Sequence, residues 1–415
     1  MEQTITKLWN KNFIMLVIGQ TISLFGNAIL RFALPFYIYL ASGSPELFGR
    51  VMGISVIPMI FISPLGGVLA DRVNKKRLIV FLDFFVAVVV FLYLWAIGAL
   101  AIVPITIIVL MLLIATNSMM SSATDSSYPL IVPTEELVRA NSLTVPITPL
   151  AMMLGSMLGG VLVVEFGLTS LLIVGGICFG LAAIMETFIR IPNIKQESAG
   201  NPLRIIATDI GNGLRFAVKT KVVIGKILIT IALLNFLVSG FAFIGVPVLT
   251  IQNLGIDERM AGIAVGIMAA GGIVAGVVSG ILGKRVRVQA CHWKLFFIGV
   301  FIIPIGLVFL LPVNNIIAFV IMTAMMFGAM GASTIMTIQV MAFVQRISPQ
   351  ELLGKVIALI MTSTMVAQPL GNWLYGILLE RFGDEPWLIL FPVSVLVMML
   401  ALWTRTFFKR IPQDA

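Results

Sequence analysis

Long apolar runs follow one another along almost the whole chain, and short polar or charged connections separate them. A helix needs about 20 apolar residues to cross the hydrocarbon core of a bilayer, and the runs reach that length. We therefore predict twelve membrane-spanning helices. They lie near residues 13–40, 46–69, 76–98, 103–131, 140–164, 168–190, 224–251, 259–283, 293–312, 315–344, 352–379 and 387–408. The longer runs require helices that tilt or that extend beyond the bilayer.

One polar connection is much longer than the others and divides the chain into halves. It extends from about Pro192 to Lys221 and contains five basic residues. Within it, residues 205–218 have the pattern of an amphipathic helix on the inner leaflet. We predict a six-helix bundle over residues 1–191, a cytoplasmic linker over 192–223 and a second six-helix bundle over 224–415.

The two halves repeat one another at an offset of 216 residues. Gly155 corresponds to Gly371 without a gap, and the segment that begins at Pro133 corresponds to the one that begins at Pro349. Chance similarity between apolar helices does not readily match glycine, proline and charged positions together. Transporters that are built from parallel half-repeats have this organisation.

The composition supports a membrane protein and argues against several other classes. The chain is 60% hydrophobic and only 11% charged, with a mean hydropathy of +1.10, and soluble globular domains are far less apolar. The two cysteines, Cys178 and Cys291, lie in different settings and argue against a disulfide or a metal site. The sequence contains no nucleotide-binding loop of the Walker type. The single histidine, His292, lies at the edge of a span, as a snorkelling interface residue does.

The distribution of Lys and Arg predicts which loops are cytoplasmic. With both termini inside, Arg50, Arg259 and Arg381 of the 27 basic residues fall outside, Arg31 falls within a span, and the remaining 23 fall inside. Cytoplasmic loops are enriched in basic residues, so this orientation is expected. The net charge of +9 follows from the topology and does not indicate a nucleic-acid partner. We expect a multi-pass protein of the plasma membrane with cytoplasmic N- and C-termini.

The densest charge cluster, Gly66–Arg77, joins the second and third predicted spans, which must form an antiparallel hairpin. The pattern Gly67-x-Leu69-Ala70-Asp71-Arg72-x-x-Lys75-Lys76 resembles the loop signature of the major facilitator superfamily, with Asn74 where the family usually has glycine. This resemblance implies a conformational gate made of Gly67, Asp71, Arg72, Lys75 and Lys76. It also implies that Asp71 lies at the start of the eleventh helix and that Asp125 ties the loop to the fourth helix.

The fifth span resembles the glycine motif of exporters in this superfamily, with Ser156 where proline is usual. We expect Gly155, Gly159 and Gly160 to pack closely against a neighbouring helix, because glycine lets backbones approach each other. A general packing seam of small residues would have the same spacing, so both interpretations stay open. Segments 129–137 and 353–356 resemble the macrolide-efflux group most, although related siderophore and lipid exporters share such loops.

A polar stripe on the first span is a candidate substrate-contacting surface. Gln20, Ser23, Asn27 and Arg31 lie within an arc of about 80° on a helix. Polar side chains on a membrane helix face protein or a water-filled cavity. We predict that substrate is bound by Gln20, Asn27, Arg31, Asn117, Asn235 and Ser239. For Arg31 the alternative is that the side chain snorkels outward.

Three acids near the cytoplasmic ends of spans are candidates for proton coupling, namely Asp83, Asp125 and Glu186. Ionisable residues within spans are rare and mark proton relays or ion pathways. For Asp83 and Glu186 the alternative is an acid that stays hydrated or that pairs with a nearby Lys or Arg.

These patterns predict an all-α integral membrane protein with the major facilitator fold, twelve helices in two pseudo-symmetric six-helix bundles. We expect a secondary active transporter that exports amphipathic or hydrophobic compounds by alternating access and proton antiport. Export of a siderophore or lipid-like metabolite is the alternative within transport. An enzyme or receptor is disfavoured, because the sequence has neither clustered catalytic groups nor a sizeable soluble domain. We expect no catalytic residues, cofactor or metal, and a monomer whose partners are substrate, protons and lipid.

Overall fold

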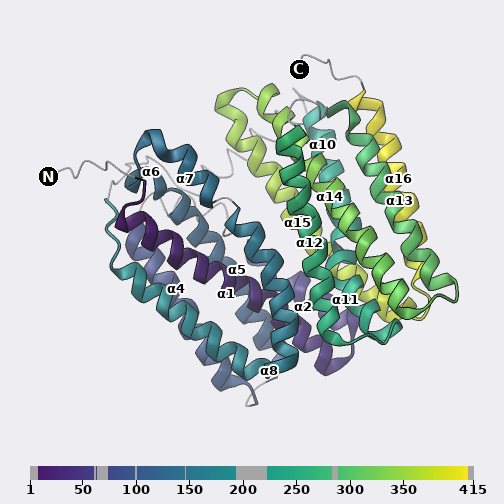
Figure 1. Cartoon of the computed structure of the whole chain (residues 1–415), viewed down its shortest axis with the longest axis horizontal. Coiled ribbons are helices and arrows are strands. Elements are labelled where there is room, and N and C mark those ends of the chain that lie inside the picture. The colour runs from purple at the N-terminus through teal and green to yellow at the C-terminus, as the bar shows by residue number, and fades with distance from the viewer. Residues whose placement is uncertain are drawn as a thin grey trace. The chain divides into compact units, whose positions relative to one another are not determined.

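The computed structural model describes residues 8–59, 62, 73–98, 101–144, 146–192, 222–282 and 288–409. These residues are almost entirely helical, and long helices dominate the view in Figure 1. The chain forms two compact units. The first comprises Met1–Leu40 and Ile54–Ile206, and the second comprises Ala41–Gly53 and Ala207–Ala415.

The first unit contains most of helix α1 and four further elements that the later argument uses. Their bounds are α1 (Lys11–Ser42), α4 (Lys75–Ala96), α5 (Ile102–Asp125), α7 (Leu137–Thr144) and α8 (Ile147–Thr187), and the short α6 (Tyr128–Ile131) and η1 (Thr134–Glu136) connect α5 to α7. Helix α4 packs along both α5 and α8. Phe13 and Leu16 of α1 are buried together with Leu82 of α4, so α1 and α4 share one apolar core.

Helix α8 covers two of the predicted spans. Gly167 interrupts it with φ 72° and ψ 168°, a backbone conformation that favours glycine because any Cβ would be strained there. Gly167 therefore separates two helices at the point where the sequence predicts the connection between the fifth and sixth spans.

The second unit contains the remaining helices. They are α2 (Pro45–Ser55), α10 (Val222–Leu234), η3 (Asn235–Ser239), η4 (Phe241–Gly245), α11 (Val246–Val248), η5 (Leu249–Asn253), α12 (Glu258–Leu282), η7 (Val288–Ala290), α13 (Cys291–Leu310), α14 (Asn315–Ile347), α15 (Gln350–Phe382) and α16 (Trp387–Phe408). Only the part of α2 up to Gly53 belongs to this unit. Helix α13 packs against α14 and α16, and α14 also packs against α12.

The seventh predicted span is an irregular helix in the structure. From α10 to η5 the chain passes through three π-helical segments, η3, η4 and η5. Wider π turns of this kind are rare and occur often at functional sites. The phenol of Tyr375 on α15 donates a hydrogen bond to the carbonyl oxygen of Leu237 at 2.6 Å, which joins α15 to the irregular region.

The segment Ala41–Gly53 follows α1 in sequence and packs within the second unit. Gly49 on α2 approaches α15 so closely that a Cβ atom there would lie 2.5 Å from the carbonyl oxygen of Asn372. The same holds for Gly376, whose Cβ would lie 2.7 Å from the carbonyl oxygen of Pro45. Because backbone lines both contacts, the two helices can touch in this way only where glycine is present.

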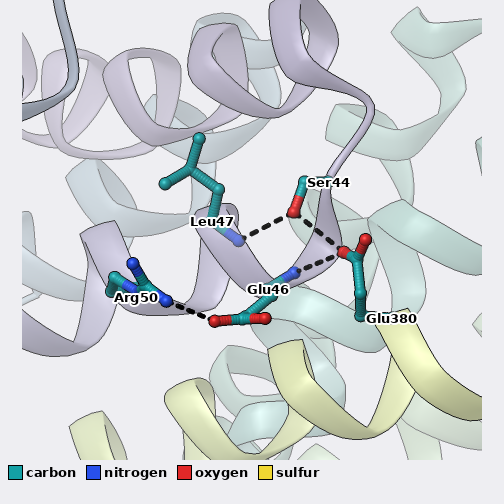
Figure 2. Close-up of polar contacts among 5 residues, drawn as sticks. All are labelled: Ser44, Glu46, Leu47, Arg50 and Glu380. Atoms are coloured by element: carbon teal, nitrogen blue, oxygen red, sulfur yellow. Dashed lines mark hydrogen bonds and ion pairs between the residues drawn. The ribbon is translucent and has the colours of Figure 1, made fainter.

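Polar contacts surround the start of α2, as Figure 2 shows. The Ser44 hydroxyl donates to Glu380 Oε2 at 2.8 Å, and the backbone N–H of Glu46 donates to the same oxygen at 3.2 Å. Ser44 Oγ in turn accepts from the backbone N–H of Leu47 at 3.2 Å, so it caps the helix. Glu46 also pairs with Arg50 one turn later.

Nine helices within the described ranges are long and apolar enough to cross a membrane. One of them, α8, holds two predicted spans, while α15 matches the eleventh span and α2 matches the beginning of the second. The all-helical fold is confirmed, and the observed helices are consistent with twelve spans. The rest of the second span, residues 193–221 of the predicted linker, and the gate residues Gly67, Asp71 and Arg72 lie outside the described residues. Lys75 and Lys76 begin α4.

Candidate functional site

The structure divides the polar stripe of α1 between two places. Ser23 and Asn27 turn toward α4 and α5, where both are buried with an exposed fraction of 4%. Gln20 is only half-buried and lines a separate cleft with residues of α5 and α7. The stripe is therefore not one continuous surface. Side chains three and four residues apart point in slightly different directions from the helix axis, so different neighbouring helices cover them.

A pair of buried carboxyl groups is the central feature of the first unit. Asp83 on α4 and Glu186 on α8 are each 1% exposed, and their side chains lie close enough to interact with each other. The hydroxyl of Ser23 on α1 donates to Asp83 Oδ1 at 2.6 Å. Three helices that are distant in sequence therefore meet at one acidic pair.

The pair has no cationic partner within the part of the chain that the structure describes. The ion pairs found there involve other acids, and neither Oδ2 of Asp83 nor either oxygen of Glu186 has a donor of its own. Two ionised carboxylates in such a place would repel each other and would both lose their hydration. A proton held between them removes one charge and supplies the missing donor, so the arrangement is suited to binding and releasing a proton.

Glycine on α1 makes room for this pair. A Cβ atom on Gly19 would lie 3.0 Å from both Cγ and Oε1 of Glu186. Since that contact is tighter than side chains normally tolerate, Gly19 lets the Glu186 carboxyl group approach α1 one turn before Ser23. Gly19 was not among the residues that the sequence predicted to be functional, and only its spacing from Ser23 could have pointed to it.

A small cavity of about 10 Å³ lies next to Asp83 and has walls that include Asn27 and Asn117. This is about the volume that one water molecule needs. Asn27 donates from Nδ2 to the carbonyl oxygen of Leu113 at 3.1 Å, while its Oδ1 is buried without a partner. Asn27 and Asn117, which we predicted to bind substrate, therefore stand beside the acidic pair.

Asp125, the third predicted proton-coupling acid, is not embedded. It lies at the C-terminal end of α5 with an exposed side chain and accepts a hydrogen bond from the Ser121 hydroxyl at 3.3 Å. Helix α5 ends at that residue and the chain turns into α6, and the role of Asp125 in proton coupling stays a prediction. Its expected partner in the basic loop is Arg72, Lys75 or Lys76. Of these, Arg72 lies outside the described residues, while Lys75 and Lys76 begin α4.

Arg31 is half-buried on α1, and no carboxylate of the described residues lies within ion-pair distance of it. Its role as a substrate contact stays a prediction. In the second unit, Asn235 and Ser239 both lie in the π-helical segment η3 and are bonded to each other, since the Ser239 hydroxyl donates to Asn235 Oδ1 at 3.2 Å. Their predicted contact with substrate also stays a prediction.

The glycines of the fifth span lie against α1. A Cβ atom on Gly155 would come within 2.5 Å of the Ala28 Cβ, and one on Gly159 within 2.8 Å of the carbonyl oxygen of Ile29. Gly160 is buried as well. The close approach holds the first part of α8 on the α1 backbone, near the residues that reach the acidic pair.

Comparisons with known proteins agree with this architecture. The chain matches the model of the Major Facilitator Superfamily over residues 16–371. It is 23% identical to macrolide efflux protein A of Streptococcus pyogenes over 400 residues, which are 92% of this chain and 93% of that protein. It is 22% identical to the uncharacterized MFS-type transporter YkuC of Bacillus subtilis over 405 residues, or 94% of this chain and 91% of that one.

Solved structures resemble the chain along nearly its full length. A D-xylose-proton symporter superposes with a TM-score of 0.74 at 12% identity and covers 97% of this chain and 98% of its own. The nucleoside transporter NupG gives 0.74 at 14% identity, with coverage of 96% and 99%. At these identities the likeness shows the fold alone.

Proposed function

Because this chain belongs to the major facilitator superfamily, we propose that it is a secondary active exporter of amphipathic or hydrophobic compounds that runs on proton antiport. The observation that carries this proposal is the buried pair of Asp83 and Glu186, which meets α1 through Ser23. Ionisable groups inside membrane proteins mark substrate and proton pathways. The chain is a multi-pass membrane transporter of that family, and the proposal adds its driving force and its substrate.

The proton step follows from the geometry of the pair. In one state of the cycle the two carboxyl groups hold a proton between them. When water reaches the pair from the cytoplasmic side, the proton leaves and the pair gains a negative charge that burial disfavours. That electrostatic penalty is relieved when the helices move and expose the pair, so proton binding can favour one conformation over another. Alternating access between such conformations is the mechanism that we propose.

The direction and substrate class rest on the relatives. Macrolide efflux protein A, as its name states, exports macrolides, and it matches 92% of this chain. We propose that this chain likewise exports macrolide-like amphipathic compounds from the plasma membrane, with both termini cytoplasmic. The excess of Lys and Arg in the predicted inner loops supports that orientation.

Transport by the purified full-length protein in liposomes tests the proposal. A radiolabelled macrolide should move against its concentration gradient when a pH gradient is imposed, and a protonophore should abolish that movement. Glu186→Gln and Asp83→Asn should each lower gradient-driven transport at least tenfold, because the neutral amides cannot release a proton. Glu165→Gln is the matched control, since Glu165 is an exposed acid on the same helix α8.

Two results would contradict the proposal in different ways. Macrolide transport that ignores both the pH gradient and the protonophore would refute proton coupling. Proton movement without macrolide movement would refute the substrate class, and a siderophore or lipid-like metabolite would then be the next substrate to test.

A further inference from the structure

A second polar site lies in the first unit, in a cleft at the end of α5. Its volume is about 190 Å³. Residues of α1, α5, α6, α7 and α8 converge on it. The walls consist of Val17, Gln20, Leu24, Ser121, Asp125, Tyr128, Asn141, Thr144, Ile147 and Thr148. The sequence pattern does not connect these helices, and among these residues it predicts a functional role only for Gln20 and Asp125.

Asp125 gives this cleft a negative charge. It is the one charged residue among the described residues that line the cleft. Within the described part of the chain, Ser121 supplies its hydrogen bond, at 3.3 Å to Oδ2. A carboxylate accepts up to about four hydrogen bonds, so the bond from Ser121 uses only a small part of its acceptor capacity.

Tyr128 is held in place beside that charge as a neutral hydrogen-bond donor. The ordinary pKa of a tyrosine phenol is about 10. The phenol therefore keeps its proton at every physiological pH and donates it to Gln20 Oε1 at 3.1 Å. This bond orients the Gln20 amide on the wall of the cleft.

The lining of the cleft also includes apolar side chains with well-packed support. Val17 and Leu24 stand one turn before and after Gln20 on α1, and Ile147 begins α8. Leu24 is buried in a cluster with Ala28 and Ala151, and Ile147 packs on the same cluster. The cleft thus combines one carboxylate, several neutral hydrogen-bonding groups and a firm apolar surface.

We propose that this cleft binds the protonated amine end of an exported amphipathic compound. The ammonium group pairs with Asp125, while its alkyl substituents contact Val17, Leu24 and Ile147. Hydroxyl or amide groups nearby on the compound meet Gln20, Asn141, Thr144 and Thr148. Sites for whole drug-sized ligands measure roughly 300–1,000 Å³, so a cleft of 190 Å³ accommodates one end of the compound only. This inference rests on the proposed export function and specifies the substrate class.

A competing role for Asp125 makes a different prediction. If Asp125 serves only to tie the basic loop around Arg72 to α5, its loss affects every substrate equally, charged or neutral. If it binds an amine, its loss affects charged substrates selectively. The ratio between two matched substrates separates the two roles.

The experiment uses a lipophilic dye with a secondary amine and its N-acetylated, neutral counterpart. Uptake of both into liposomes that contain the full-length protein gives KM for each. Asp125→Asn should lower the preference for the amine over the neutral dye about tenfold, which corresponds to a loss of ~1.4 kcal/mol. Asp125→Glu should keep most of the preference. Glu135→Gln should not change it, because Glu135 is an exposed acid of η1 that does not line the cleft.

Each outcome decides the question. If Asp125→Asn changes the transport of neither dye, the proposal is wrong. If it lowers the transport of both dyes equally, the proposal is also wrong and the loop role is supported. If the wild-type protein transports neither dye, the proposed export function fails for these compounds. Equilibrium binding to the detergent-solubilised protein then tests the cleft by itself. An amine site should bind the amine dye more tightly than the neutral dye, and Asp125→Asn should remove that difference in affinity. A folded mutant is verified by size-exclusion chromatography.

Discussion

The carboxyl groups of Asp83 on α4 and Glu186 on α8 interact with each other inside the first unit, where each residue has an exposed fraction of 1%. The two residues are far apart in sequence and belong to different predicted spans. Ser23 attaches the pair to α1, the helix that also forms a wall of the Asp125 cleft. A change in the pair can therefore reach the proposed substrate site through a single helix.

Gly19→Ala should impair transport by displacing Glu186. The added methyl group would lie 3.0 Å from Glu186 Cγ and Oε1, and overpacking of this kind costs about 1–3 kcal/mol. We expect a lower melting temperature and slower gradient-driven transport. Gly180→Ala on α8 is the control, since a methyl group there would meet no neighbouring side chain or helix within 4 Å. Equal melting temperatures for the two variants would argue against the tight contact.

Ser23→Ala should weaken the attachment of the acidic pair to α1. The lost bond is 2.6 Å long and ends on a carboxyl group, and bonds to charged groups contribute about 1.5–3 kcal/mol. Transport should slow, and Ser23→Thr should restore much of it because the hydroxyl returns. Ser156→Ala is a comparison of equal size, since Ser156 bonds only to carbonyl groups of its own helix. If Ser23→Ala is no more harmful than Ser156→Ala, the hydrogen bond has no special role.

Glu380→Ala should loosen the start of α2. The variant removes the acceptor for the Ser44 hydroxyl and for the Glu46 N–H (Figure 2). Loss of about 1.4 kcal/mol would speed hydrogen exchange of the amides at residues 46 and 47 about tenfold. Hydrogen exchange with mass spectrometry provides the measurement, and Glu385→Ala, a change at an exposed acid nearby, is the control. Unchanged exchange at both positions would contradict the assignment of Glu380 as the acceptor that holds this helix start.

Arg31→Ala should change which compounds are exported more than Arg31→Lys does. Lysine keeps the positive charge but loses the planar fork of the guanidinium group, while alanine loses both. The measurement is the concentration dependence of export for a panel of anionic, neutral and cationic compounds. Identical profiles for both variants would mean that Arg31 only anchors α1 at the membrane surface.

The hydrophobic pattern alone determined the helices of this protein. Apolar runs long enough to cross a bilayer predicted α4, α13 and α16 close to their observed bounds, because a chain in lipid has to satisfy its backbone hydrogen bonds internally. The expected break between the fifth and sixth spans coincides with Gly167, where the backbone adopts a conformation that glycine favours. The glycines of the fifth span were also recognisable, since their spacing places them on one side of a helix.

The partners of the polar residues were decided only by the tertiary structure. Periodicity placed Gln20, Ser23, Asn27 and Arg31 on one stripe, but packing assigned Ser23 to Asp83 and Gln20 to the Asp125 cleft. Periodicity reports the direction of a side chain from its own helix axis, whereas its partner depends on which neighbouring helix covers that direction. For the same reason the sequence could name Asp83 and Glu186 as separate acids, and only the packing of α4 against α8 made them a pair.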